Sequence, residues 1–177
     1  MRVAGRFPWL TVSVFVLTTL VTAAQFAWPG VVPALRRQPS MVADGEAWRF
    51  VTAWLVHDEG ARQIVFNFTA LAIAGTFVEL VLGRWIWVAA YVIGGLSGEI
   101  AGLFWQPVGA GNSVAVCGLI GALASWQARR RAVPVLARFI FPLACFGGGL
   151  VLIANRDIHG PPLLVGGAIG LLGKAPQ

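Results

Sequence analysis

Long apolar runs separated by short polar segments recur along this chain, and they constrain its fold more than any other feature. Each run approaches the length of about 20 residues that a helix needs to cross a bilayer. Only 11% of the 177 residues are charged, 58% are hydrophobic, and the mean hydropathy is +0.78. A water-soluble domain of this size has too much surface to hide such a composition. The sequence therefore predicts an all-α polytopic membrane protein.

The apolar runs predict six membrane-spanning helices packed as a single domain. A long segment between the first two spans mixes charged residues with apolar stretches, which predicts an interfacial first loop with short amphipathic helices. We interpret the first run as a retained span and not as a cleaved signal peptide, because no clear small-x-small cleavage site precedes Gln25. The expected spans cover residues of about 7–28, 63–82, 85–105, 113–128, 133–154 and 158–172.

Basic residues are distributed unevenly among the segments that join the spans. The net charge is +6, and the densest cluster is Arg129-Arg130-Arg131, on the same side of the six-span arrangement as Arg2 and Arg6. Because Lys and Arg accumulate in cytoplasmic loops, this cluster predicts cytoplasmic termini and suits a bacterial inner membrane. Topology thus explains the positive charge, and we expect no nucleic-acid partner.

A glycine-rich loop delivers a serine to the start of the short fourth span. Residues 109–113 read Gly-Ala-Gly-Asn-Ser. Glycines permit close backbone approach, and a helix N-terminus presents free N–H donors that suit developing negative charge. Ser113 is therefore a candidate nucleophile, supported by Gly111 and Asn112, with Cys117 one turn below it. The alternative is that Ser113 only caps the helix.

Two further polar features are expected on the same, outer side. His159 begins the last span, and a histidine can remove a serine proton and return it to a leaving amine. Gly166 and Gly170 would let this span pack tightly on the fourth. Gln63 and Asn67, one turn apart on the second span, are amide donors that could stabilise an oxyanion. The alternatives are an interfacial histidine and hydrogen bonds between helices.

Motifs in the first loop and the second span follow one known pattern. Trp48-Arg49 is followed by His57 and then by the segment 63–67, Gln-Ile-Val-Phe-Asn. The second span closes with small and acidic residues four apart, at Gly75, Glu79 and Gly83.

The last three spans carry the rest of that pattern. Gly111-Asn112-Ser113 precedes two further helix glycines, and His159 precedes two glycines of the last span. Together with the motifs of the first loop, these segments resemble the rhomboid intramembrane serine proteases over most of the chain. The glycines concerned are Gly118 and Gly121, and Gly166 and Gly170.

The resemblance implies a Ser–His dyad that cleaves transmembrane segments of other membrane proteins within the lipid bilayer, with no metal or other cofactor. Ser113 would attack the scissile carbonyl, and His159 would act as general base and then general acid. The Ser113 N–H and Asn67, with Gln63 or His57, would hold the oxyanion.

Three departures from the family pattern leave other interpretations open. Val114 replaces the glycine that follows the nucleophile, Gln63 replaces a histidine, and the family's register for the last histidine falls on Leu164. We keep His159, because the insertion Gly160-Pro161-Pro162 would shift the start of that helix. The alternative is a catalytically inactive rhomboid-like protein that binds transmembrane helices. A small transporter is disfavoured, because the sequence has no internal repeat.

Three acidic residues, one of them (Glu79) near the inner end of the second span, are not expected to carry the chemistry. We expect Asp157 to cap the last span rather than to orient His159, because it lies only two residues before the histidine. Glu79 is expected to pair with Arg84 or to bind loop backbone. Glu99 is expected either to face the cavity above the site or to pair with an arginine of the first loop.

Overall fold

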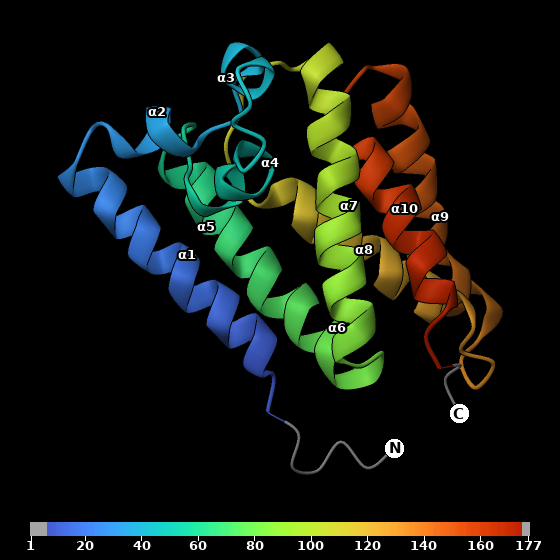
Figure 1. Ribbon diagram of the computed structural model, residues 1–177. Helices are drawn as coiled ribbons and strands as arrows, with labels where there is room; N and C mark the ends of the chain where they lie inside the picture. Colours follow the sequence, from blue (N-terminus) through green and yellow to red (C-terminus); the bar gives the residue numbers. More distant parts are fainter. Residues whose placement is uncertain (1–6, 175–177) are drawn as a thin grey trace.

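A computed structural model describes residues 7–174 of the chain, so Arg2 and Arg6 lie outside the described residues. Over residues 7–174 the regular structure is helical, apart from one isolated β-bridge between Arg37 and Gly109. This confirms the all-α prediction for the described part of the chain. Its two ends lie at the same end of the helical bundle, opposite the short helices of the first loop (Figure 1).

The long helices correspond to the predicted apolar runs. Four segments are long and apolar enough to cross a membrane: Trp9–Ala27, Ala61–Val81, Arg84–Trp105 and Val135–Ala154. Two shorter apolar helices, Ser113–Ala128 and Gly160–Leu171, correspond to the fourth and sixth runs. The labels of these elements are α1 (Trp9–Ala27), α5 (Ala61–Ala70), η2 (Leu71–Gly75), α6 (Thr76–Val81), α7 (Arg84–Trp105), α8 (Ser113–Ala128), α9 (Val135–Ala154) and α10 (Gly160–Leu171).

The segment between α1 and α5 folds into short helices at one end of the bundle (Figure 1). Arg49 of the Trp-Arg motif is buried there, and its guanidinium donates to the carbonyls of Pro33 and Arg36 at 2.8 and 2.9 Å. These bonds tie the later part of the loop to its beginning. The short helices are α2 (Val31–Leu35), α3 (Pro39–Ala43), α4 (Arg49–Thr52) and the 3₁₀ turn η1 (Ala53–Leu55).

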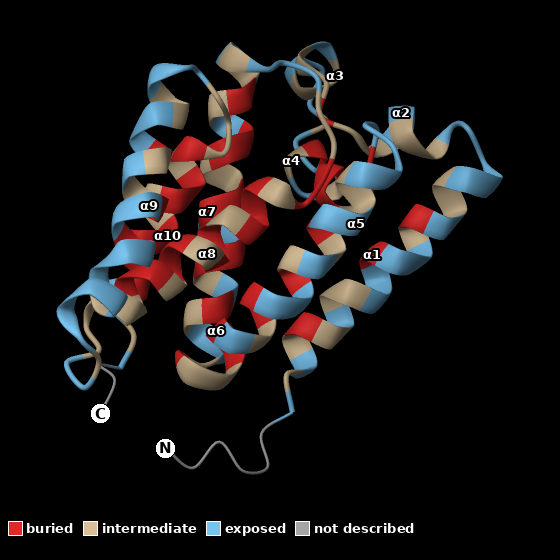
Figure 2. Cartoon of the chain, turned by 180° about the vertical axis from the view of Figure 1, so that it is seen from behind, coloured by how far each residue is buried: buried red, intermediate tan, exposed pale blue. Residues whose placement is uncertain are grey.

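Buried residues gather on α7, α8 and α10, whereas the outer face of α9 is exposed (Figure 2). Glycines explain how these three helices approach so closely. A Cβ added at Gly166 of α10 would lie 2.0 Å from the carbonyl oxygen of Gly118 on α8, and one at Gly170 would lie 2.6 Å from the Cα of Ala122. A Cβ at Gly94 of α7 would lie 2.8 Å from the Cα of Gly118. Backbone therefore packs on backbone, as small residues four apart allow.

Glu79 joins the second long segment to the first helix. Its carboxylate accepts the N–H groups of Leu10 and Thr11 at 3.1 and 2.9 Å, and Thr11 Oγ1 lies 3.0 Å away. An acid is favourable there, because free N–H donors and the positive end of the helix dipole meet at a helix N-terminus. Glu79 also forms an ion pair with Arg84 at 3.4 Å. The expected pair with Arg84 is thus present, whereas the backbone that Glu79 binds is the start of helix α1 and not a loop.

Candidate active site

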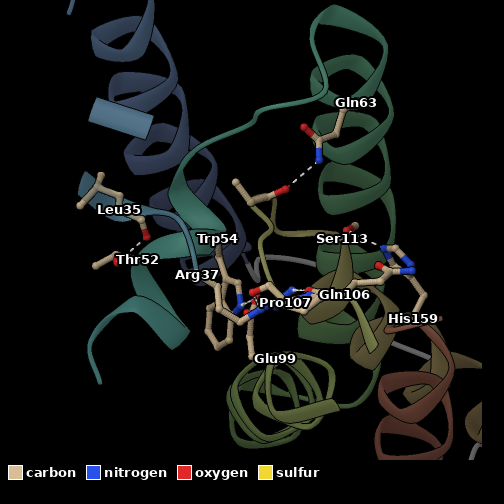
Figure 3. A network of polar contacts seen from close by, with 11 residues as sticks. Leu35, Arg37, Thr52, Trp54, Gln63, Glu99, Gln106, Pro107, Ser113 and His159 are labelled. Atoms are coloured by element: carbon tan, nitrogen blue, oxygen red, sulfur yellow. Dashed lines mark hydrogen bonds and ion pairs between the residues drawn. The ribbon is translucent and has the colours of Figure 1, made fainter. Parts of the chain in front are cut away.

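A cavity of about 580 Å³ opens between the first loop, α5, α7 and the starts of α8 and α10. Five of the predicted site residues line it, namely Ser113, His159, Gln63, Asn67 and Gly111. These residues come from three separate parts of the chain, and Figure 3 shows Ser113 and His159 turned toward each other. The fold thus brings together the polar features that the sequence placed on one side.

The start of α8 faces the start of α10 across this cavity. Ser113 is the first residue of α8, and its Oγ lies 2.8 Å from Nε2 of His159, the residue that precedes α10. Leu164, at the alternative register, lies instead near Gly149 of α9. The histidine that reaches the serine is therefore the one before the Gly160-Pro161-Pro162 insertion.

Asp157 contacts the other nitrogen of the same imidazole. Its Oδ1 accepts the backbone N–H of His159 at 2.9 Å and lies 2.6 Å from His159 Nδ1. Partial burial raises the pKa of Asp157, but its hydrogen bonds with the backbone and ring of His159 outweigh this, so its pKa falls below its ordinary value. Asp157 therefore binds a backbone N–H just before α10, as expected of a capping residue, but the expectation that it would not orient His159 was wrong, because the same oxygen also contacts the ring.

The glycine loop before Ser113 lies against the two amides of α5. Gly111 has a φ of +127°, which an L side chain rarely adopts. A Cβ added there would also lie 2.8 Å from Gln63 Nε2 and 3.2 Å from Asn67 Nδ2. Gln63 Nε2 donates to the carbonyl of Ala110 at 2.7 Å, and its side-chain oxygen accepts the N–H of Glu59 at 3.1 Å.

Asn67 differs from Gln63 in having a free donor. Its side chain is 1% exposed, and its Nδ2 has no hydrogen-bond partner among the described residues. Buried donors are rarely left unpaired in folded proteins. Just beyond Asn67, the π-helical turn η2 (Leu71–Gly75) interrupts the α-helix, and such turns are frequent at functional sites. Asn67 therefore lines the cavity and carries a buried donor beside the glycine loop that has no partner among the described residues.

Three residues close to Ser113 in the sequence pack against neighbouring parts of the bundle. Asn112 is fully buried beside His57 and Tyr91, but neither polar atom of its side chain forms a well-oriented hydrogen bond with a described residue. Val114 is 1% exposed and packs over Gly98 of α7, where an added Cβ would lie 2.8 Å from Val114 Cγ1. Cys117 packs against a small apolar cluster that contains Cys145, and both cysteines are free.

The structure does not bring His57 to the cavity. Its Nδ1 lies 3.2 Å from Thr22 Oγ1 of α1, and its backbone groups bond the side chain of Gln25. Burial lowers the pKa of His57 to about 4, so the ring is neutral at physiological pH. This placement favours a role in joining the first loop to α1, and it does not favour the predicted role in an oxyanion hole.

A buried polar cluster, in which the sequence identified Glu99 but not Arg37, holds the glycine loop from the other side. Arg37 of the first loop forms an ion pair with Glu99 of α7, and Trp54 Nε1 donates to the same carboxylate at 3.0 Å. The Arg37 guanidinium also donates to the carbonyls of Gln106 and Pro107, as Figure 3 shows.

Backbone contacts reinforce this cluster. The backbone of Arg37 pairs with Gly109, with N–O distances of 2.9 and 3.3 Å. Arg37 and Glu99 both line the cavity, so the two roles expected for Glu99 are present together. Arg37 carried no signal in the sequence, because it is one of several arginines in a mixed loop and its partner lies 62 residues away.

Within residues 7–174, no group of three or more His, Cys, Asp or Glu side chains could hold a metal ion. The site itself offers a serine hydroxyl, an imidazole contacted at both nitrogens, the carboxylate of Asp157 and an amide donor that has no partner among the described residues.

Comparison with known proteins gave two matches. A model of the family described as the Rhomboid domain matches residues 44–172, which include the first-loop motifs, the glycine loop, Ser113 and His159. A stretch of 88 residues is 36% identical to the rhomboid protease GluP of Bacillus subtilis. That stretch is 49% of this chain but only 17% of the relative, so most of the relative has no counterpart in the alignment.

Proposed function

The chain belongs to the rhomboid family, and from this premise we propose that it is an intramembrane serine protease in which Ser113 and His159 form the catalytic pair. It is an integral membrane protein by its family and its apolar helices. The observation that carries the proposal is the 2.8 Å contact between Ser113 Oγ and His159 Nε2 inside the cavity. This is the geometry that a serine nucleophile and its general base require.

In the proposed reaction Ser113 Oγ attacks the carbonyl carbon of the scissile bond, while its proton passes to His159 Nε2. The carbonyl π electrons move to oxygen, which gives a tetrahedral oxyanion. His159 then donates this proton to the leaving amine as the C–N bond breaks, and an acyl-enzyme remains. Water, deprotonated by the same imidazole, then attacks the acyl carbon; the bond from this carbon to Ser113 Oγ breaks, the imidazole returns its proton to Oγ, and the new carboxyl end of the substrate leaves.

The oxyanion needs hydrogen-bond donors that are already in position. Asn67 is the best candidate, because its buried Nδ2 has no other partner among the described residues. The free N–H groups at the start of α8, including that of Ser113, are the second source. Gln63 is a weaker candidate in this conformation, since its Nε2 already donates to the carbonyl of Ala110.

The substrates proposed are transmembrane segments of other membrane proteins. In the corresponding topology the six apolar helices all cross the bilayer, both termini are cytoplasmic, and the protein resides in a bacterial inner membrane. α8 has only 16 residues. A helix of that length spans about 24 Å, so its first residue would lie below the membrane surface.

The decisive experiment compares Ser113→Ala with Ser97→Ala in the full chain, purified in detergent and reconstituted into liposomes. Ser97 lies on α7, where its hydroxyl donates to the carbonyl of Gly94, and it is not among the residues that line the cavity. We expect Ser113→Ala to abolish both cleavage of a model transmembrane substrate and labelling by a fluorophosphonate.

The control Ser97→Ala should retain cleavage and labelling, and both variants should melt close to the wild type. Cleavage by Ser113→Ala would show that the nucleophile is assigned wrongly. A wild-type protein that neither cleaves nor becomes labelled at Ser113 would indicate an inactive relative that binds transmembrane helices.

A further inference from the structure

The turn between α9 and α10 fixes the backbone of Asp157. The N–H of Asp157 donates to the carbonyl of Leu152 at 2.8 Å, and the N–H of Arg156 donates to that of Ile153 at 2.9 Å. These two bonds form the Schellman motif that commonly ends a helix. Arg156 has a φ of +56°, a left-handed conformation that costs a non-glycine residue on the order of 1 kcal/mol. Asp157 is thus held by the end of one helix immediately before the next begins.

The carboxylate of Asp157 determines which imidazole nitrogen carries the proton. A neutral imidazole has one N–H, and an ionised carboxylate can only accept. Because Asp157 Oδ1 lies 2.6 Å from His159 Nδ1, the proton must be on Nδ1 for this contact to be a hydrogen bond. Nε2 is then the acceptor that faces the hydroxyl of Ser113 at 2.8 Å. This is the tautomer that can take the proton of the serine.

We propose that Asp157 is a positioning residue of the catalytic site, so that the protein works through a Ser113–His159–Asp157 triad and not through the Ser–His dyad implied by the family resemblance. The proposal rests on the proposed function and deepens it. Asp157 keeps the proton on Nδ1 and fixes the orientation of the ring. It also stabilises the imidazolium that forms when His159 takes the serine proton, without accepting a proton itself.

The acidic groups that line the cavity are not placed for this role. Asp58 and Glu59 are exposed residues of the first loop, and Glu99 is paired with Arg37 and Trp54. Among residues 7–174, Asp157 is the one carboxylate that forms a hydrogen bond or ion pair with His159. Among the described residues, a single carboxylate therefore contacts the imidazole of His159.

The solvent exposure of the Asp157 side chain determines how far its loss should lower kcat. Loss of the buried aspartate of a soluble serine protease lowers kcat about 10⁴-fold. The Asp157 side chain is 31% exposed, so water and ions screen its charge. We therefore expect its loss to lower kcat on the order of 10- to 100-fold.

The first experiment separates the charge of Asp157 from its bond to the backbone. In Asp157→Asn, the amide oxygen can still accept the N–H of His159, but the charge is lost and an NH₂ group can face Nδ1. We expect kcat to fall on the order of 10- to 100-fold, with KM changed less than about threefold and with little change in Tm. Asp157→Glu should recover part of the loss. Asp44→Asn, at an exposed residue of the first loop, is the control for the same chemical change and should match the wild type.

The second experiment reads the tautomer directly. The chain has only two histidines, so ¹⁵N-histidine labelling gives four ring-nitrogen signals, and His57→Gln assigns them. In detergent micelles at neutral pH, the His159 signals of the wild type and of Ser113→Ala should both show the proton on Nδ1. In Asp157→Asn the His159 signals should shift toward the Nε2–H tautomer, while those of His57 stay unchanged.

Each outcome distinguishes this proposal from the proposed function. If Ser113→Ala still cleaves, the protease mechanism itself is wrong. If Ser113→Ala is inactive but Asp157→Asn keeps the kcat and the tautomer of the wild type, the dyad stands and the triad is refuted. If Asp157→Asn lowers Tm and kcat together while the tautomer is unchanged, Asp157 is only a structural residue, and the triad is likewise refuted.

Discussion

The contact between Gly166 of α10 and Gly118 of α8 should set the distance between His159 and Ser113, and Gly166→Ala tests this. A Cβ at Gly166 would lie 2.0 Å from the carbonyl oxygen of Gly118, whereas Cβ contacts below 3.0 Å essentially do not occur. The obstacle is backbone and not a flexible side chain. α10 must therefore retreat from α8 by about 1 Å, the difference between these two distances.

A retreat of α10 would also separate the two catalytic side chains. A shift of about 1 Å carried to the start of α10 would lengthen the 2.8 Å contact between Ser113 Oγ and His159 Nε2 to roughly 3.8 Å, beyond hydrogen-bond reach. A misplacement of that size can cost about 100-fold in rate. Overpacking of a close helix contact costs about 1–3 kcal/mol of stability. We therefore expect kcat/KM to fall on the order of 100-fold in a protein that still folds.

The assay compares Gly166→Ala with Gly147→Ala. Gly147 lies within α9, and a Cβ added there meets no heavy atom within 4 Å. The control therefore adds the same methyl group without a clash, and it gains the helix propensity of alanine. Cleavage of a transmembrane substrate in liposomes, fluorophosphonate labelling and thermal melting are measured on both variants.

We expect Gly147→Ala to match or exceed the wild type in stability and to match it in activity. A folded Gly166→Ala that cleaves within about threefold of the wild type would refute the reasoning, because the predicted loss is about 100-fold. The contact between α8 and α10 would then not govern the catalytic distance.

Three further predictions concern residues outside the catalytic pair. Asn67→Ala should lower kcat about 10²- to 10³-fold, as loss of an oxyanion donor does, with less effect on KM; an unchanged kcat would exclude Asn67 from the oxyanion hole. Arg37→Met should lower the free energy of unfolding by about 3–5 kcal/mol, because it leaves the carboxylate of Glu99 buried without its partner. Arg37→Met combined with Glu99→Leu should recover much of this loss in a double-mutant cycle, and strictly additive effects would contradict the coupling. Burial lowers the pKa of His57 from about 6.5 to about 4, so between these pH values the unfolded chain binds a proton that the folded protein does not. Stability should therefore be complete above about pH 6.5 and fall by up to about 3 kcal/mol as the pH drops to 4; equal pH dependence in wild type and His57→Gln would contradict this.

The residues that meet in the cavity were predictable because each carried a local signal. The glycine loop marked Ser113, and the spacing of one helical turn paired Gln63 with Asn67. The placement of basic residues then put these side chains and His159 on one side. The sequence did not predict which hydrogen-bond partners these side chains have. Gln63 and Asn67 have similar amides one turn apart, yet only Asn67 keeps an unpaired donor.

The sequence did not predict the contact of Arg37 with Glu99 or that of Asp157 with the His159 ring, and the two physical reasons differ. Arg37 acts through a partner 62 residues away in the chain, and no periodicity or motif connects the two. Asp157 lies only two residues before His159, a separation that normally points side chains apart at the start of a helix. The left-handed conformation of Arg156 changes the direction of the chain at that point. Sequence propensity disfavours this conformation for arginine, so the turn becomes visible only in the folded chain.

Val114 is one of the three departures from the family pattern, and a glycine on another helix accommodates its side chain. A Cβ at Gly98 of α7 would lie 2.8 Å from Val114 Cγ1 and also 2.8 Å from the carbonyl oxygen of Ile158. The same absent side chain thus makes room for valine beside Ser113 and for the backbone immediately before His159. Because both groups meet α7 at one point, the valine leaves the 2.8 Å contact between Ser113 and His159 undisturbed. Whether a residue after the nucleophile is tolerated therefore depends on the helix that faces it, and the nucleophile motif by itself does not decide it.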